Sequence, residues 1–182
     1  MQPARHHLRQ ATQAHHARVD AAFSLFDLAD TAAYGRFLSA HARVLLPLEA
    51  ALAGDATFAS MPSAASRLRS QALKDDLDAL RLPLPHDPPP TLPADREGVA
   101  GICYVLEGSR LGGRVLARRV AAAPGPLPAA FLRHGEDQPL WPTFLAWLES
   151  LTWTPAGLAR AAAAASATFD GFLTAAQQTR TP

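Results

Sequence analysis

The chain has 182 residues, enough for one domain with a sizeable core, and no change in composition marks a second domain. Its 17 lysine and arginine residues against 16 acidic residues give a formal net charge of +1, which argues against a nucleic-acid partner. The single cysteine, Cys103, excludes an intrachain disulfide and a multi-cysteine metal site, and the sequence shows neither a signal-peptide pattern nor an apolar run of about 20 residues. We therefore expect one cytoplasmic domain over residues 1–182, with no membrane partner.

The first two predicted helices follow from apolar residues that recur every three or four positions. The first is expected over residues 4–28 and the second over residues 31–52, with Asp30 as the N-cap of the second. Pro47 lacks a backbone N–H, and we expect it to bend the second helix or to end it early.

A third helix is expected after Ser63, because apolar residues recur there at helical spacing while charged residues take the opposite face. It should stop before the segment 83–93, in which six of eleven residues are proline. Proline removes helix donors and stiffens the chain, so this segment is expected to be a loop between helices. A simple connector is favoured over a ligand for a partner domain.

The fourth helix is expected over residues 94–122. An apolar stripe that begins at Trp141 predicts a further helix. Thr154 and Pro155 then predict the N-cap and first turn of a last helix that ends near Gln178. The sequence thus predicts an all-α, single-domain bundle of six to seven helices.

Three glycines lie within residues 104–116 of the fourth predicted helix: Gly108, Gly112 and Gly113. Each costs roughly 1 kcal/mol relative to alanine, so another interaction must offset that cost. Gly108 and Gly112 are four positions apart and share one helix face, where a ligand or another backbone can approach closely. Spacing alone favours a tight crossing of two helices over a ligand.

The first helix carries two adjacent histidines, His15 and His16. At 100° per residue, His15 falls with Leu8 at the centre of the apolar stripe, and His16 falls at its edge. Arg9 is two turns before His16, so a guanidinium and an imidazole share one side of the helix, about 10 Å apart by helical rise. This pair suits an iron porphyrin, whose metal takes a nitrogen ligand and whose propionates take a cation. For a lone histidine, however, a structural role is the more common one.

Two segments together resemble the heme oxygenase family. Residues 8–20 are similar to its first-helix pattern of leucine, a basic residue, Ala-Thr and the proximal histidine, with the match on His16. Residues 104–116 are similar to its glycine-bearing distal helix, with Gly108 and Gly112 at the two positions that lie over the heme.

Two further segments extend the resemblance over most of the chain. Residues 67–80 are similar to a family segment that contains an Asp-Leu pair, here Asp76-Leu77, and Pro47-Leu48-Glu49 resembles the end of the family's second helix. The expected fold is therefore heme oxygenase-like, with heme between the first helix and the distal helix.

The resemblance implies which residues do the chemistry. His16 would ligate the heme iron, and Arg9, assisted by Tyr104, would hold the propionates. Gly108 and Gly112 would leave space for dioxygen, so the implied catalytic residues are Gly108, Ser109 and Gly112. Electrons would come from an external donor such as a ferredoxin or a reductase. The implied products are biliverdin, carbon monoxide and ferrous iron, and a phytochrome-like protein is one possible acceptor of the biliverdin.

Some alternatives stay open at the level of sequence. Mammalian-type members carry an aspartate where this chain has Ser109, so the anchor of the distal water is open between that hydroxyl, Arg110 and a helix carbonyl. The stripe favours His15 as the buried residue, whereas the family pattern selects His16 as the ligand. A heme carrier without catalysis, or a helical scaffold for another ligand, are the competing functions. Cys103 is expected to be a small core residue.

A basic patch is expected at the end of the distal helix. It consists of Arg114, Arg118 and Arg119. A solvated face is favoured over a docking site for an acidic electron donor.

Overall fold

The computed structural model describes residues 3–180, and all regular structure in that range is helical. In chain order the elements are α1 (Ala4–Phe23), α2 (Thr31–Leu52), α3 (Ala56–Ala59), the 3₁₀ turn η1 (Ala64–Arg67), α4 (Ser70–Ala79), α5 (Arg96–Gly108), α6 (Arg110–Ala121), α7 (Ala130–Arg133), α8 (Leu140–Ser150) and α9 (Pro155–Thr179). Seven of these have ten or more residues, which confirms the predicted all-α class.

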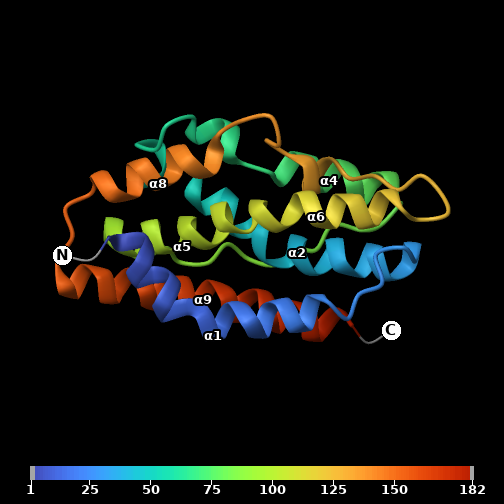
Figure 1. Cartoon of the computed structure of the whole chain (residues 1–182). Helices are drawn as coiled ribbons and strands as arrows, with labels where there is room; N and C mark the ends of the chain where they lie inside the picture. The colour runs from blue at the N-terminus through green and yellow to red at the C-terminus, as the bar shows by residue number, and fades with distance from the viewer. Residues whose placement is uncertain (1–2, 181–182) are drawn as a thin grey trace.

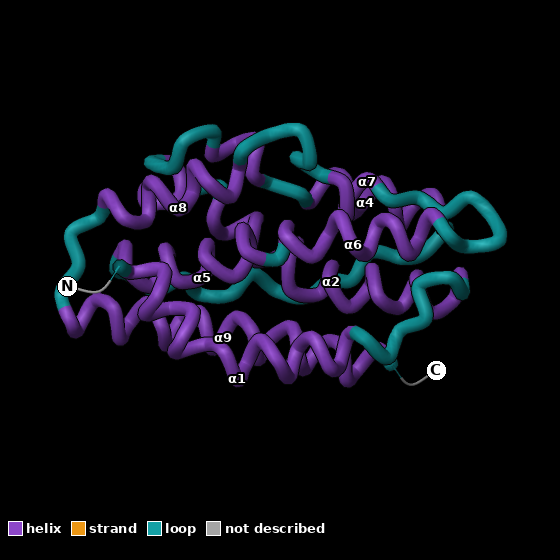
Figure 2. The backbone as a smooth tube through the Cα atoms, viewed as in Figure 1, coloured by secondary structure: helices purple, strands orange, loops and turns teal. Residues whose placement is uncertain are grey.

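The helices form a bundle in which α1 and α9 lie side by side along one edge (Figure 1). Helix α9 also packs on α5 and α2, so the longest helix supports three others. Helices α4 and α7 lie on the side of the bundle away from α1, whereas α8 packs on α5 and contacts the start of α1 (Figures 1 and 2). The core between them is apolar, and its most deeply buried side chains include Leu8, Tyr34, Phe37 and Phe144.

Both predicted N-caps are confirmed. The Asp30 carboxylate accepts from the backbone N–H of Ala33, and the Thr154 hydroxyl accepts from that of Gly157. Helix α1, however, ends at Phe23 and not at residue 28, and a turn at residues 24–30 follows it. That turn still buries Phe26 and Leu28, which explains why the apolar spacing continued past the helix end.

Of the two effects expected of Pro47, a bend in the second helix or an early end to it, the early end is wrong. Helix α2 runs on to Leu52 with Pro47 inside it. A proline within a helix removes the hydrogen bond to the carbonyl four residues before it, here Arg43, and the bonds on either side can persist. Burial of Leu45, Leu48 and Leu52 on one face offsets that loss.

Two predicted helices are each divided. The third consists of η1 and α4, and Arg69 ahead of α4 and Ser70 in its first turn donate their backbone N–H groups to the buried carboxylate of Glu49 on α2. A capping group from another helix leaves no local pattern in the sequence. The fourth breaks at Ser109, which separates α5 from α6.

The proline-rich segment 83–93 contains no regular structure up to the turn before α5. Leu82, just before it, packs so closely on Gly35 that a Cβ there would lie 2.7 Å from the leucine side chain. Within residues 3–180, every helix falls short of the length and apolarity that a bilayer crossing requires.

Candidate functional site: a crevice between α1 and α6

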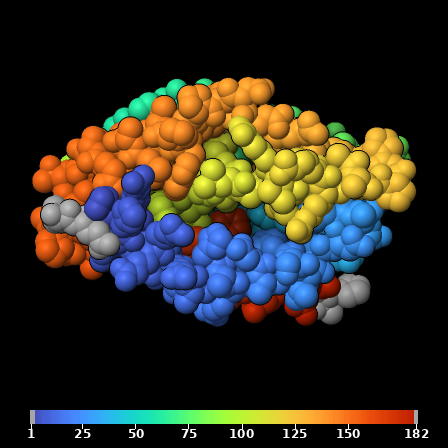
Figure 3. Space-filling model, viewed as in Figure 1, coloured from blue at the N-terminus to red at the C-terminus, as the bar shows by residue number. Residues whose placement is uncertain are grey.

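A hollow opens between α1 and α6 on the face shown in Figure 3, and α9 is visible at its floor. It exists because α1 packs on α9 while α6 packs on α7, on the other side of the bundle. The residues selected from the sequence lie on the elements around this hollow: Arg9 and His16 on α1, and Tyr104, Gly108 and Gly112 on α5 and α6.

His16 is held at the surface of α1 with one ring nitrogen occupied. Its side chain is 61% exposed, and its Nδ1 lies 3.0 Å from Oδ2 of Asp20, one turn later. Phe169 of α9 contacts the ring edge-on, with 5.6 Å between ring centroids. A carboxylate at Nδ1 favours the proton on that nitrogen, which leaves Nε2 with a free lone pair. This is the form that a metal-binding histidine requires.

His15 points elsewhere, toward α9. Its Nδ1 lies 3.0 Å from Oδ1 of Asp170, and the same carboxylate is 3.6 Å from Nη1 of Arg18. The side chain is 28% exposed, less than half the value for His16. His15 therefore fastens α1 to α9, whereas His16 is free to meet a ligand.

Arg9 and Tyr104 are close enough for the arginine charge to act on the phenol. Burial raises the pKa of Tyr104, and the positive charge of Arg9 works against that rise. The phenol ring also contacts Trp141 at 5.9 Å between centroids. One end of the hollow thus presents a guanidinium from α1 and a hydroxyl from α5, which is a suitable pair for a carboxylate.

The glycines of the distal segment fall into two kinds. A Cβ on Gly112 would meet no atom within 4 Å, and one on Gly108 would only touch Trp141 at an ordinary 3.7 Å. A Cβ on Gly113 would come within 2.6 Å of the Leu132 carbonyl oxygen. Gly113 is therefore the residue at a tight crossing, and the crossing favoured from spacing does not apply to Gly108 or Gly112. Gly112 borders open space, and Gly108 lies at ordinary contact distance from Trp141.

An exposed apolar strip on α6 was missed in the sequence. Leu111 and Val115 are 57% and 45% exposed, and they flank Gly112 on the face opposite to the buried Gly113 and Ala117. Large apolar side chains that remain exposed in this way often mark a binding surface. The signal was present as two apolar residues four apart that do not share the face of Ala117 and Val120.

A buried polar cluster behind the break at Ser109 was also missed. The Ser109 hydroxyl donates to the Leu106 carbonyl at 2.7 Å, and Arg69 donates to the same carbonyl at 3.1 Å and to the Ser109 oxygen at 3.0 Å. In an unbroken helix that carbonyl would pair with the amide of residue 110. Arg69 thus compensates for the break. Because Arg69 is 40 positions from Ser109 in sequence, no local pattern predicts this contact.

His41 of α2 lies among aromatic rings beside this cluster and is neutral. Its Nδ1 donates to the Phe37 carbonyl at 2.9 Å, and burial, helped by the charge of Arg69, lowers its pKa to about 4. His41, Arg69 and Ser109 all line one small cavity of about 30 Å³. A weak signal for His41 is present in the sequence, where a histidine follows Phe37 by one turn on an apolar face.

The depressed pKa of His41 predicts a loss of stability in acid. An unfolded histidine takes up its proton near pH 6.5, before the folded one does, so stabilisation is complete above about pH 6.5 and is lost progressively toward pH 4. The expected loss is up to about 3 kcal/mol. Urea unfolding from pH 8 to pH 4.5 measures it. The variant His41→Gln should lose less stability over that range, and an identical loss in both proteins would contradict the assignment.

Two of the segments that resemble the family have clear structural roles. Asp76, of the Asp-Leu pair, accepts from the backbone N–H groups of Ala130 and Phe131 at 3.0 and 2.9 Å, and so starts α7, which supports Gly113. Glu49 starts α4, as described above. Both carboxylates position the elements behind the distal segment. Cys103 is buried in the core, as expected, and burial raises the pKa of its thiol.

Comparisons with known proteins identify the family and the fold. No family model matches the sequence. A protein of Xanthomonas campestris pv. campestris named heme oxygenase is 36% identical over 149 residues, which span 80% of this chain and 89% of that protein. The fold is similar to that of the heme oxygenase of Neisseria meningitidis, solved with NO and CO bound, with a TM-score of 0.78 over 98% of this chain and 92% of that chain at 20% identity. Because the identity to the Xanthomonas protein extends over four fifths of the chain, the protein belongs to the heme oxygenase family.

Proposed function

We propose that this chain binds heme in the crevice between α1 and α6 and cleaves it oxidatively to biliverdin, carbon monoxide and ferrous iron. The observation that carries the proposal is that an exposed histidine with a free Nε2 lies on one of the two helices that border the hollow, and an open glycine, Gly112, lies on the other. When bound, heme supplies the redox-active iron and is itself the substrate. Dioxygen and electrons from an external donor, of the ferredoxin or reductase class, complete the reaction.

On the α1 side, His16 would ligate the iron through Nε2. The Asp20 carboxylate holds the proton on Nδ1 and increases the basicity of the ring, as carboxylates beside metal-ligating histidines commonly do. Phe169 limits how far the ring can rotate. Arg9 and Tyr104 would bind the propionates, for which the guanidinium supplies charge and two parallel donors.

On the α6 side, backbone without side chains gives dioxygen access. Gly112 borders open space, and any larger residue there would project into it. Leu111 and Val115 add apolar surface on the same face, which excludes water from the rest of the site and favours a flat apolar ligand.

The reaction also consumes protons, and we assign their delivery to Ser109 and Arg69. The Ser109 oxygen accepts from Arg69 while its hydroxyl donates to Leu106, so the serine is fixed in orientation. Both residues line the cavity of about 30 Å³, enough for one or two water molecules. A water held there can accept and donate protons. In this role Arg69 with Ser109 replaces the aspartate of other family members.

The proposal predicts stoichiometric heme binding followed by turnover. Hemin titration should give one heme per chain and a Soret band of histidine-ligated iron. With an electron source and air, that band should disappear while a verdin absorption and carbon monoxide appear. Absence of stoichiometric binding would contradict the proposed site.

A heme carrier on the same scaffold would give a different result. It would bind hemin and become reduced, but it would release no carbon monoxide. The open space at Gly112 favours the enzyme, because a carrier has no need for access beside the bound heme.

A further inference from the structure

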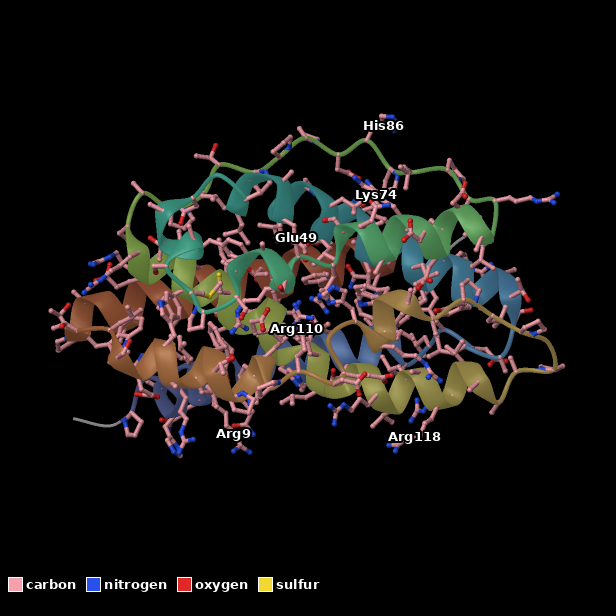
Figure 4. The ribbon with its side chains drawn as sticks, turned by 90° about the horizontal axis from the view of Figure 1, so that it is seen from above. Arg9, Glu49, Lys74, His86, Arg110 and Arg118 are labelled. Carbon is pink, nitrogen blue, oxygen red and sulfur yellow. The ribbon has the colours of Figure 1, made fainter. Side chains whose placement is uncertain are left out.

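The small cavity behind the helix break is surrounded by cationic and neutral donors. Its lining includes His41, Arg69, Ser109, Arg110 and His134. Figure 4 shows Arg110 and Glu49 inside the bundle, whereas Arg9 and Arg118 project from its edge. The cavity measures about 30 Å³, so it can hold two water molecules or one small ion but no larger ligand.

The carboxylates near the cavity do not balance the guanidinium groups. Glu107 is shared by two arginines: Arg67 lies 2.5 Å from one oxygen, and Arg110 lies 3.1 Å from the other. Glu49 directs its oxygens to the backbone of Arg69 and Ser70 instead. Three guanidinium groups therefore face two carboxylates.

Of these three arginines, Arg69 has the weakest pairing with a carboxylate. It is buried, its Nε has no hydrogen-bond partner, and the nearest Glu49 oxygen is 4.0 Å away. Burial, and next the charge of Arg110, lowers its pKa to about 10. A buried charge without a full partner is costly, and an anion beside it would remove that cost.

The two histidines of the cavity do not compensate for the excess charge, and both stay neutral near pH 7. His41 has a pKa of about 4, and burial with the charges of Arg110 and Arg69 lowers the pKa of His134. His134 accepts from Arg110 at Nδ1, which leaves its Nε2 as an N–H donor. Asp76, the next carboxylate along, is bonded to two backbone amides of α7.

We propose that this cavity is a binding site for one small monovalent anion, of the size of chloride, held by the positive charges of Arg69 and Arg110. Binding depends only on the charge and size of the cavity. Its consequence rests on the proposed function: an anion would displace the water assigned to Ser109 and Arg69, so it should slow turnover while leaving heme binding intact.

The test measures halide binding on the heme-free chain. Chloride-35 NMR should show an excess line broadening in the presence of the protein. This broadening should saturate as added chloride fills the site, and bromide should reverse it. Arg110→Gln should weaken the saturable broadening at least about tenfold, whereas Arg118→Gln, an equal change of charge on the exposed side of the same helix, should retain it.

A second variant covers the case in which Arg110→Gln does not fold. His134→Glu places a carboxylate next to Arg110, so it should abolish halide binding by supplying the missing negative charge internally. Crystals grown with bromide should show one anomalous peak in the cavity. Broadening that does not saturate, an equal loss with Arg118→Gln, or water alone in the cavity would each overturn the proposal. None of these outcomes depends on heme cleavage.

Discussion

Replacing Gly112 by leucine should strongly reduce heme turnover while leaving the fold intact. A Cβ at this position meets no atom within 4 Å, so the side chain fits the protein and projects into the crevice that dioxygen must enter. Helix propensity improves by somewhat less than 1 kcal/mol on replacing glycine, so thermal stability should hold or rise. Turnover should fall by roughly 100-fold, the scale of loss that misplacement of reacting groups by about 1 Å causes. Carbon monoxide release and the unfolding midpoint measure the two effects.

The adjacent glycine provides the matched control. Gly113→Ala gains the same helix propensity, but its Cβ would come within 2.6 Å of the Leu132 carbonyl, so α6 and α7 must move apart. We expect it to be destabilised by about 1–3 kcal/mol. Turnover of Gly112→Leu equal to that of the parent protein would mean that the crevice face of α6 has been misassigned.

The sequence predicted well those features that depend on local spacing. The all-α class and the N-caps at Asp30 and Thr154 follow from residues within one turn of each other, and the structure confirms them. The three glycines of residues 104–116 were also visible, but spacing did not show which of them packs against another helix. Only the position of α7 distinguishes the packed Gly113 from the open Gly112.

The polar cluster at the helix break was beyond the reach of sequence reasoning. Glu49 lies on α2, Arg69 just ahead of α4 and Glu107 on α5, and all three are buried. The break at Ser109 depends on the same long-range contacts, since Arg69 supplies a donor to the Leu106 carbonyl. A helical pattern relates residues only three or four positions apart, so it does not reveal a partner as distant as Arg69.

The choice between the two histidines gives the second large expected effect. His16→Ala should remove the proximal ligand and leave a pentacoordinate or water-ligated heme. Loss of a partner that merely orients a ligand already costs 10–100-fold, so we expect turnover to fall by at least about 100-fold. Added imidazole should restore part of it, because the cavity left by the side chain faces the crevice. The Soret spectrum and carbon monoxide release measure both changes.

His15→Ala is the matched variant, since it removes an identical side chain one position away. His15 pairs with Asp170 of α9, so its loss should cost about 1 kcal/mol of stability and leave the histidine-ligated spectrum unchanged. Helical neighbours point about 100° apart, so the two rings cannot both face one iron. The ring of His16 is exposed and its Nδ1 lies beside Asp20. This geometry supports His16, which the family match selects, over His15, which lies at the centre of the apolar stripe. Loss of ligation in His15→Ala alone would show that the match is displaced by one residue.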